Sequence, residues 1–217
     1  MKLSIIILCY NKYNFTKSCL DDLSKLSNDT EIIVYDNGST DETHSKLMDT
    51  KEFRYIRSDI NYGFGPGNNK AYKFSSGDNI LFLNNDIRVK DNFDNWTDKL
   101  IDSSALTGPT MGLLDKDFNF IKEENRLLLG GNSYMSGWCI CGSRQTWEKL
   151  KEDGKIFDER YPHFFEDTDL SFRARELKIP FKVVDIPVVH FGKISGKQLN
   201  IPKLYQTSKK LFIEKWK

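Results

Sequence analysis

Polar side chains that could do chemistry follow an apolar run near the middle of the chain. The run Ile80–Leu83 is followed directly by Asn84, Asn85 and Asp86. A carboxylate at the end of a buried strand is well placed to bind a hard divalent cation such as Mg²⁺ or Mn²⁺, whose remaining ligands are water and substrate phosphates. The alternative is a simple turn in which these side chains bond to the local backbone, and the residue types alone favour that alternative.

A second pair of acids, Glu166 and Asp167, stands at the start of a predicted helix over 166–177, directly after Phe164 and Phe165. Acids are common at this position because they interact favourably with the positive end of the helix dipole. The same position keeps a carboxylate ionised and able to accept a proton as a general base, and the two aromatic rings could form a dry wall beside it. The motif alone favours the capping role over catalysis.

His190 follows the apolar run Val183–Val189. A histidine at a strand end is commonly a hydrogen-bonded structural residue, but neutral imidazole also binds divalent metals. A metal-binding role would require Asp86 and Asp167 to lie near it. A glycine-rich loop over 63–67 could turn backbone N–H groups toward phosphate. It lacks the Gly-Lys-Ser/Thr ending of a P-loop and the spacing of a dinucleotide fingerprint, which argues against those two functions.

The elements that must position these residues alternate between strand and helix patterns in the first half of the chain, which predicts βαβ units and a parallel sheet. The predicted strands are Leu3–Leu8, Glu31–Tyr35, Phe53–Arg57 and Ile80–Leu83, and the predicted helices include Thr43–Met48 and Asn68–Phe74. Ser39 and Glu42 have the spacing of a capping box for the first of these two helices. Ligands bind at the carboxyl ends of parallel strands, so Tyr10, Asp36 and Asp86 are expected to converge on one edge.

The second half of the chain is less regular. Its predicted elements are a helix over Asp91–Ile101, a helix capped by Ser143 that runs through Leu150, the helix that begins at Glu166, and a strand over Phe181–Val184. Residues 107–135 are rich in turns and predict no clear element. Residues 202–216 predict an amphipathic helix with Leu204, Phe212 and Trp216 on one face. Such a face is more often docked on its own domain than laid on an anionic membrane, and both readings stay open.

Composition sets the broad class. Hydrophobic residues make up 39% of the 217 residues and aromatics 13%, which predicts a folded chain of one α/β domain. Lys and Arg number 32 against 31 for Asp and Glu, so no global positive field exists to hold a polyanion, which argues against nucleic acid as a partner. The charge is uneven, because residues 197–217 carry six Lys and one Glu.

The cysteines predict a reducing compartment. Cys9, Cys19, Cys139 and Cys141 are too few and too unevenly spaced for a disulfide scaffold, and the last two lack zinc-ligand spacing. No stretch approaches the roughly 20 apolar residues that a membrane span needs. We therefore expect a cytoplasmic protein, with contact at the inner face of the membrane through the C-terminal helix as an open alternative.

A set of motifs in a fixed order carries a resemblance that runs from residue 3 to about residue 195. The motifs are Ser4–Asn11, Ile33–Asp41, Asn61-x-Gly63-Phe64 with Asn69, Leu81–Asp86, Ser136-Gly137, Phe157-Asp158-Glu159, Glu166–Arg173 and Val189-His190. Together they resemble the family 2 glycosyltransferases of the GT-A fold, in particular the rhamnosyltransferase-like branch that decorates bacterial surface polysaccharides. The resemblance implies a single domain with a Rossmann-like, mostly parallel central sheet flanked by helices.

The resemblance also divides the chain and assigns roles to its residues. It implies a nucleotide-binding half over 1–102, an acceptor and catalytic half over 103–200, and a C-terminal amphipathic helix over 201–217. The residues implied to bind the nucleotide sugar are Tyr10, Asp36, Asn69, Asn84 and Asn85. Asp86 and His190 are implied to hold Mn²⁺ or Mg²⁺, with Asn84 in the place of the first acid of an Asp-x-Asp motif. Asp167 matches the catalytic base, and Glu166 is implied to accept a hydrogen bond from the acceptor or to orient that base. Trp138 lies where an acceptor pocket is expected, and ordinary core packing is an equal alternative for it.

The function implied is inverting, metal-dependent transfer of one sugar from a nucleoside-diphosphate sugar, with UDP or dTDP favoured, to a glycan or lipid-linked acceptor. One alternative is a nucleotidyltransferase that makes sugar nucleotides, although the glycine-rich loop such enzymes carry after the first strand is absent here. Another is a catalytically silent carbohydrate-binding protein on the same fold. Turnover of a nucleotide sugar separates the last alternative from the first reading.

Overall fold

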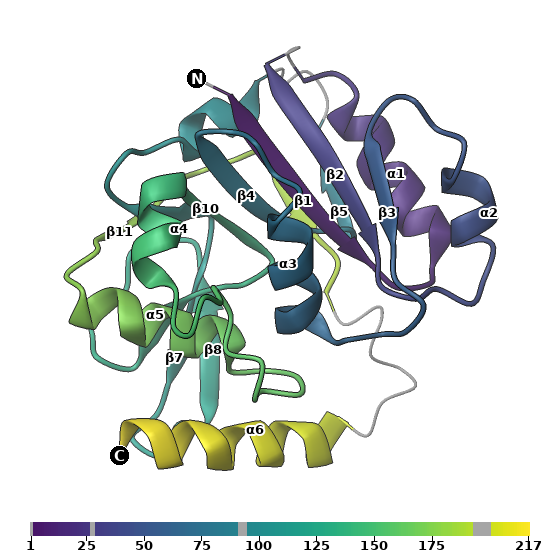
Figure 1. Ribbon diagram of the computed structural model, residues 1–217. Coiled ribbons are helices and arrows are strands. Elements are labelled where there is room, and N and C mark those ends of the chain that lie inside the picture. Colours follow the sequence, from purple (N-terminus) through teal and green to yellow (C-terminus); the bar gives the residue numbers. More distant parts are fainter. Residues whose placement is uncertain (1, 27–28, 91–94, 193–200) are drawn as a thin grey trace.

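A seven-stranded sheet forms the centre of the protein in the computed structural model, which describes residues 2–26, 29–90, 95–192 and 201–217 (Figure 1). The strands, in spatial order, are β11 (Phe181–Val183), β6 (Leu106–Gly108), β10 (Cys139–Ser143), β4 (Asn79–Asn84), β1 (Leu3–Cys9), β2 (Thr30–Asp36) and β3 (Arg54–Arg57). Strands β4, β1, β2 and β3 are mutually parallel, and β10 runs antiparallel between β4 and β6. The expected α/β architecture with a mostly parallel sheet is confirmed.

Helices cover both faces of this sheet because side chains alternate along each strand. On one face, Ile5 and Ile7 pack with α1 (Tyr13–Leu23) and with a 3₁₀ helix, Trp96–Leu100. On the other face, Ile6 and Phe82 pack with α3 (Phe64–Tyr72), α4 (Arg144–Leu150) and α5 (Glu166–Glu176). The carboxyl ends of β1, β2 and β4 are thereby held at one rigid edge. A short helix, α2 (Thr43–Leu47), follows β2.

Two small sheets complete the second half of the chain. Strand β5 (Ile87–Val89) pairs with β12 (Val188–His190), which returns the chain to the end of β4. Strands β8 (Phe120–Glu124), β7 (Met111–Leu114) and β9 (Ser133–Met135) form a three-stranded antiparallel sheet. These last three strands occupy the region for which the sequence predicted no element.

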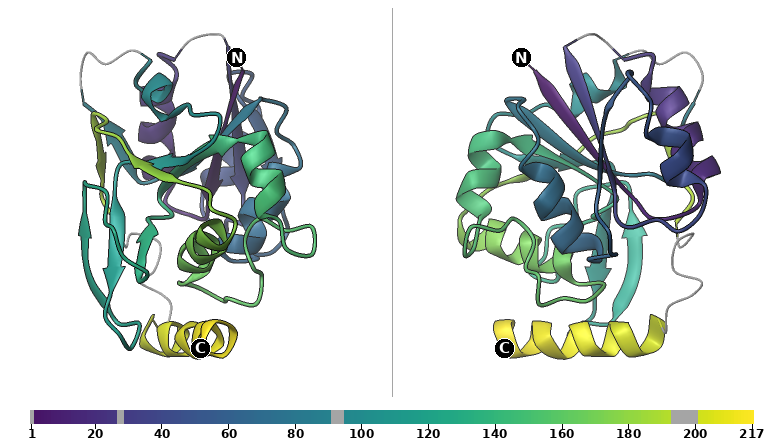
Figure 2. Two further views of the ribbon diagram at one scale, coloured as in Figure 1. Left: turned by 90° about the vertical axis from the view of Figure 1, so that its left-hand side faces the viewer. Right: turned by 45° about the vertical axis from the view of Figure 1, so that its right-hand side comes forward.

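The C-terminal helix α6 (Ile201–Trp216) lies across α5 and the lower end of the β7–β8 sheet (Figure 2). Its buried face carries Phe212 into a third apolar cluster with Phe118 and Phe165. The amphipathic pattern is confirmed, and this face docks on the chain itself. No helix among the described residues is long and apolar enough to cross a bilayer.

Several local predictions were wrong. Ser39 does not cap α2, because its Oγ accepts a hydrogen bond from the backbone N–H of Asn11, and Asp41 accepts the N–H of Thr43 instead. Helix α3 begins at Phe64, earlier than predicted, so the second and third glycines of the loop lie inside it. A Cβ at Gly67 would stand 2.7 Å from Leu8 Cδ1, which shows how closely α3 packs on β1. The helix predicted over Asp91–Ile101 is only the short 3₁₀ turn, and residues 91–94 lie outside the described residues.

Candidate active site

The carboxyl ends of β1 and β2 are joined by polar contacts. Asn11 follows the half-buried Tyr10 and adopts a left-handed conformation, with φ of 55°. Its Oδ1 accepts hydrogen bonds from the backbone N–H groups of Thr40 at 2.7 Å and Asp41 at 3.2 Å. Asn tolerates this backbone region better than most residues do. The two loops therefore form one connected edge beside Tyr10.

Asp36, at the end of β2, is fully buried and its carboxylate is held by three groups. Oδ1 accepts the backbone N–H of Ser39 at 2.8 Å, and Oδ2 accepts the hydroxyl of Tyr55 at 2.6 Å. Arg57 Nε lies 3.6 Å from Oδ2. Charge-assisted hydrogen bonds of this kind fix both the orientation and the position of a carboxylate. The Asp36 carboxylate is therefore fixed in place at the end of β2.

The end of β4 brings an acid and an imidazole together. Asp86 Oδ1 lies 3.1 Å from His190 Nε2, and Asn84 Nδ2 lies 3.4 Å from the same nitrogen. The pairing of β5 with β12 places them there, because His190 stands opposite Ile87 in that ladder. Asn85 points elsewhere and donates to Thr16 Oγ1 on α1 at 2.8 Å. Asp86, His190 and Asn84 thus form one compact group with carboxylate, imidazole and amide ligand atoms.

Trp138 forms the wall behind His190. The two rings stack with centroids 4.7 Å apart and an angle of 11° between their planes. The indole N–H donates to Thr110 Oγ1 at 2.9 Å and to Glu123 Oε1 at 3.1 Å. Only 8% of Trp138 is exposed. The ring therefore orients His190 and offers little free surface of its own.

Asp167 lies in the first turn of α5 and is held by backbone amides. Its Oδ2 accepts the N–H of Gly137 at 2.9 Å, and its Oδ1 accepts the N–H of Thr168 at 2.7 Å. A Cβ at Gly137 would stand 3.1 Å from Asp167 Cβ and 3.2 Å from its Oδ2, so the absence of a side chain permits this approach. Glu166 is buried beside it, and its Oε2 has no hydrogen-bond partner among the described residues.

Burial raises the pKa of both carboxyl groups in this pair. For Glu166 the neighbouring charge of Asp167 raises the pKa further. For Asp167 the amide hydrogen bonds from Gly137 and Thr168 oppose the effect of burial and lower the pKa, while the charge of Glu123 raises it. A carboxylate with a raised pKa is a stronger base, which suits proton transfer near neutral pH.

The backbone just before this pair is unusual. Phe164 and Phe165 both have positive φ, 69° and 68°, in the left-handed region that aromatic residues rarely adopt. Such residues persist only where the surrounding structure holds them, and they gather at functional sites. The two consecutive left-handed residues turn the chain sharply into α5 and so direct Glu166 and Asp167.

Adjacent residues connect the two acidic groups. The N–H of Gly137 binds Asp167, and the ring of the next residue, Trp138, stacks on His190. The carbonyl of Trp138 also accepts the N–H of Asn84 at 2.8 Å, which ties this segment to the end of β4. The acid–imidazole group and the acid pair of α5 are therefore parts of one site.

Comparison with known proteins shows what the first part of the chain resembles. Residues 4–101 match the family model described as glycosyl transferase family 2. This part of the chain is therefore similar to the family 2 glycosyltransferases. A stretch of 96 residues is 38% identical to the poly(ribitol-phosphate) beta-glucosyltransferase of Bacillus spizizenii, covering 40% of this chain and 15% of that protein.

Solved GT-A glycosyltransferases share the fold of this chain. A mannosyltransferase from Pyrobaculum calidifontis, in complex with GDP-Man and Mn²⁺, aligns with a TM-score of 0.60 at 13% identity and covers 84% of this chain and 54% of its own. Residues 1–349 of S. aureus TarS, in complex with UDP-GlcNAc, align with a TM-score of 0.58 at 20% identity and cover 95% and 64%. The chain therefore spans less than two thirds of each of these relatives.

The predicted site residues fall into two sets. Eight lie along the connected edge or in the site just described: Tyr10, Asp36, Asn84, Asp86, Trp138, Glu166, Asp167 and His190. Asn85 is turned toward α1, and Asn69 is committed to the backbone of the second half. Asn69 Oδ1 accepts the N–H groups of Ile156 and Phe157, and its Nδ2 donates to Phe157 O at 2.7 Å and to Glu159 Oε1 at 3.2 Å. These bonds use the full capacity of the Asn69 amide.

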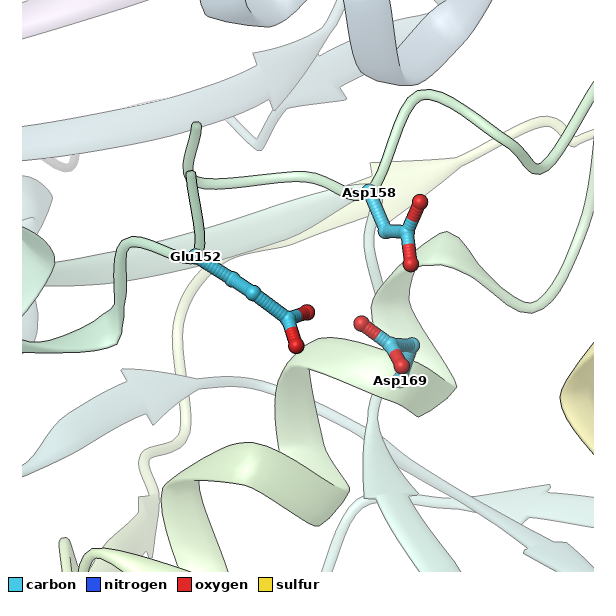
Figure 3. Close-up of side chains that lie close together, drawn as sticks. All are labelled: Glu152, Asp158 and Asp169. Carbon is cyan, nitrogen blue, oxygen red and sulfur yellow. The ribbon is translucent and has the colours of Figure 1, made fainter. Parts of the chain in front are cut away.

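A second acidic group, Glu152, Asp158 and Asp169, lies away from the connected edge, near the start of α5 (Figure 3). Its ligand atoms lie within 4.8 Å of one another. Basic side chains already neutralise these charges. Lys215 Nζ lies 2.9 Å from Asp169 Oδ1 and 3.3 Å from Asp158 Oδ2. Arg173 Nε lies 2.9 Å from Asp169 Oδ2. This group is an ion-pair network, and a metal ion there would have to displace a lysine.

Two residues of the site escaped the sequence reasoning. Glu123 and Thr110 hold the Trp138 indole, and Thr110 Oγ1 also donates to Glu123 Oε1 at 2.5 Å. Glu123 stands in a run of mixed charges, Lys-Glu-Glu, which is typical of a solvated strand. Strand geometry places Glu123 and Ile121 on the same face of β8, but the sequence has no apolar alternation there that would have predicted the strand.

Proposed function

We propose that this protein transfers one sugar from a nucleoside-diphosphate sugar to an acceptor hydroxyl, with inversion at the anomeric carbon. The observation that carries the proposal is the Gly137–Trp138 link, which holds a carboxylate of raised pKa beside an acid–imidazole group at the carboxyl edge of the sheet. A base and an anion-compensating site side by side are what glycosyl transfer from a diphosphate leaving group requires.

The nucleotide is assigned to the edge formed by β1 and β2. Tyr10 would pack on the base, and the buried Asp36 would give the base a fixed hydrogen-bond partner or fix the loop that does so. The similar structures were solved with UDP-GlcNAc and with GDP-Man, so nucleotide sugars as a class are supported. We favour UDP or dTDP over GDP. Residues 1–102 would then be the nucleotide-binding half and residues 103–200 the acceptor and catalytic half.

The residues at the end of β4 fit a divalent cation. Asp86 supplies a hard carboxylate oxygen, His190 supplies an imidazole nitrogen, and Asn84 supplies an amide beside them, a set that suits Mn²⁺ or Mg²⁺. When bound there, such an ion would neutralise the charge of the diphosphate. The stacked Trp138 holds the His190 ring in the orientation that this role needs.

Asp167 is assigned as the general base. It takes the proton of the acceptor hydroxyl as that oxygen forms its bond to the anomeric carbon, and the bond from that carbon to the diphosphate oxygen breaks on the opposite face. The two amides that hold Asp167 fix its direction before the acceptor arrives. Glu166, whose pKa is raised by burial, keeps its proton to higher pH than an ordinary glutamic acid and can donate a hydrogen bond inside the site.

The acceptor is proposed to be a glycan or a lipid-linked sugar, in polysaccharide synthesis. The Trp138 ring is mostly buried and offers little surface to an acceptor. Its contribution would be indirect, through the neighbouring Gly137, whose N–H binds Asp167. Peripheral contact of α6 with the inner face of a membrane stays a prediction. The apolar face of that helix would not make the contact, because it already packs on Phe118 and Phe165.

A panel of UDP-, dTDP- and GDP-sugars tests the function directly. We expect one sugar donor to raise the melting temperature of the protein in the presence of Mn²⁺ but not in EDTA. The rise should be several degrees when the concentration of the donor is far above its Kd. Mass spectrometry of mixtures with glycan acceptors should then show a single added sugar. Binding without any transfer or hydrolysis across the panel would instead favour a silent carbohydrate-binding protein. In a separate mixture, formation of a sugar nucleotide and pyrophosphate from a sugar phosphate and a nucleoside triphosphate would favour a nucleotidyltransferase.

Substitution of Gly137 by Ala probes the geometry that carries the proposal. The added methyl would stand about 3.1 Å from Asp167 Cβ, so the carboxylate must move. A small displacement of a base lowers turnover sharply, and we expect kcat to fall about tenfold or more while KM for the sugar donor changes little. Gly130→Ala is the matched control, because a Cβ there meets nothing within 4 Å. Equal kcat for the two variants would argue against Asp167 as the group in contact with the acceptor.

A further inference from the structure

Helix α6 holds the chain just before the acid pair of α5. Ser208 Oγ donates to the carbonyl of His163 at 2.6 Å. The ring of Tyr205 packs on Phe164 and Phe165, with centroids 5.7 Å and 5.3 Å apart. The backbone at three successive positions, 163 to 165, is therefore braced by one face of α6.

The same face of α6 supports the left-handed conformation of Phe165. Phe212 is fully buried, with its ring centroid 5.1 Å from that of Phe165, 4.9 Å from that of Phe172 and 5.0 Å from that of Phe118. A left-handed aromatic residue costs roughly 1–3 kcal/mol of strain. Two occur in sequence here, and the apolar burial that offsets them comes in large part from α6.

The C-terminal end of α6 holds α5 just after the acid pair. The indole N–H of Trp216 donates to Asp169 Oδ1 at 2.9 Å, and Lys215 Nζ lies 2.9 Å from the same oxygen. Asp169 is fully buried and directly follows Asp167 and Thr168 in the first turn of α5. Arg173 holds the other oxygen of Asp169. The first turn of α5 is thus fixed through one carboxylate by groups from two helices.

We propose that α6 is the positioning element for the acid pair and that Lys215 is a positioning residue acting through Asp169. The residues at 166 and 167 lie between two points that α6 anchors, the loop at 163–165 and Asp169. With both points held, Asp167 stays at hydrogen-bond distance from the N–H of Gly137. The effect on the rate of transfer rests on the proposed function, whereas the effect on the position of Asp167 does not.

Lys215 is the sensitive point because of the charges around it. Its Nζ also contacts Asp158 and Glu152, and only 14% of its side chain is exposed. Without this ammonium group, the three carboxylates of the ion-pair network would face Arg173 and Arg160 alone. Removing one partner from a buried charged group leaves repulsion that the local structure relieves by moving. Glu152 and Asp158 lie outside α5, whereas Asp169 lies in its first turn, so part of this repulsion would act on that turn although Arg173 and the Trp216 indole still hold Asp169.

The test compares Lys215→Met with Lys210→Met, a lysine on the exposed face of the same helix. Lys215→Arg is the conservative variant. Backbone hydrogen exchange at Gly137 and Thr168, whose N–H groups bind Asp167, is measured first because it needs no substrate. We expect exchange at these two amides to speed up about tenfold or more in Lys215→Met, with amides of β1 and β4 unchanged. Lys210→Met and Lys215→Arg should behave like the unaltered protein.

Steady-state kinetics with the sugar donor found in the panel is measured second. Positioning predicts a fall in kcat of about tenfold for Lys215→Met, with KM for the sugar donor within about twofold, and recovery in Lys215→Arg. A general loss of stability would instead lower the apparent enzyme concentration and speed exchange at the amides of β1 and β4 as well as at Gly137 and Thr168. Ser208→Ala, which removes only the bond to the His163 carbonyl, provides a milder second variant if Lys215→Met does not fold.

The outcomes separate the two proposals. Unchanged exchange at Gly137 and Thr168 in folded Lys215→Met and in Ser208→Ala would overturn the positioning role, whatever the activity. If the unaltered protein transfers no sugar from any donor of the panel, faster exchange at these amides in Lys215→Met would still support the positioning role, while the proposed function would be removed. Faster exchange together with lower kcat at constant KM supports both.

Discussion

Substitution of Asp167 by Asn is expected to lower kcat by about 10²–10⁴-fold, the usual range for loss of a general base. Asn is close in shape to Asp, so the hydrogen bonds with Gly137 and Thr168 change locally, together with the charge that acts on Glu166. The Kd of the sugar donor should remain within about twofold, because Asp167 is assigned to the acceptor and not to the nucleotide. Initial rates and calorimetric titration with the sugar donor measure the two quantities separately.

The pH dependence of kcat gives a second signature of the same residue. Burial raises the pKa of Asp167 above the usual Asp value of about 4. A base works only in its deprotonated form, so activity should be present above this raised pKa and be lost as the pH falls through it. The acid limb of the profile is therefore expected above pH 4, and the residual activity of Asp167→Asn should lack that limb.

Asp49→Asn, an exposed acid in the turn after α2, is the control for both measurements. If Asp167→Asn kept more than about a tenth of the activity of this control, the assignment of Asp167 as base would be wrong. Glu166 would then be the next carboxylate to examine, since it is the buried neighbour in the same turn.

Substitution of Asp86 by Asn should remove the metal-dependent part of sugar-donor binding. The carboxylate that contacts His190 Nε2 is the charged member of the group at the end of β4. Loss of a ligand is expected to weaken the bound cation at least as much as loss of an outer contact, about 10–100-fold in affinity or activity. We expect transfer at fixed Mn²⁺ to fall at least about 100-fold and part of the loss to be recovered at higher Mn²⁺.

Titration of Mn²⁺ in the presence of a fixed sugar donor, followed by melting temperature, measures this effect. Asp158→Asn serves as a contrast, because Asp158 belongs to the ion-pair network that Lys215 and Arg160 already neutralise. It should change stability without moving the Mn²⁺ midpoint. A midpoint that moved with Asp158→Asn and stayed constant with Asp86→Asn would locate the cation in that network instead.

The sequence predicted the first half of the fold well because its strands are long and apolar. Leu3–Leu8 and Ile80–Leu83 became β1 and β4, fully buried strands at the centre of the sheet. The second half was harder, because β7, β8 and β9 are short and the edge strand β8 exposes Phe120 and Ile121. An exposed strand with mixed charges has no periodic apolar signal to detect.

Site residues were predictable where a strand ends and less so where a side chain has several possible partners. Asp86 and Asp167 could be singled out as candidates by their positions at a strand end and a helix start, but only the resemblance favoured a functional role for them. Asn69 could not be distinguished from a ligand-binding residue, because its partners in the 156–159 segment lie nearly 90 positions away in sequence. The left-handed Phe164 and Phe165 were also beyond prediction, since aromatic side chains disfavour that conformation.

The antiparallel strand β10 has a practical consequence for work on this protein. The segment recognised as family 2, residues 4–101, ends before β10, yet β10 pairs along the whole of Cys139–Ser143 with β4. In a fragment cut at residue 101, the edge of β4 that pairs with β10 would be unpaired. Ile80, Leu81 and Phe82 would then lose their backbone partners on that side. Such an edge invites strand-to-strand association between molecules. The limits of the recognisable sequence are therefore not the limits of a soluble folding unit.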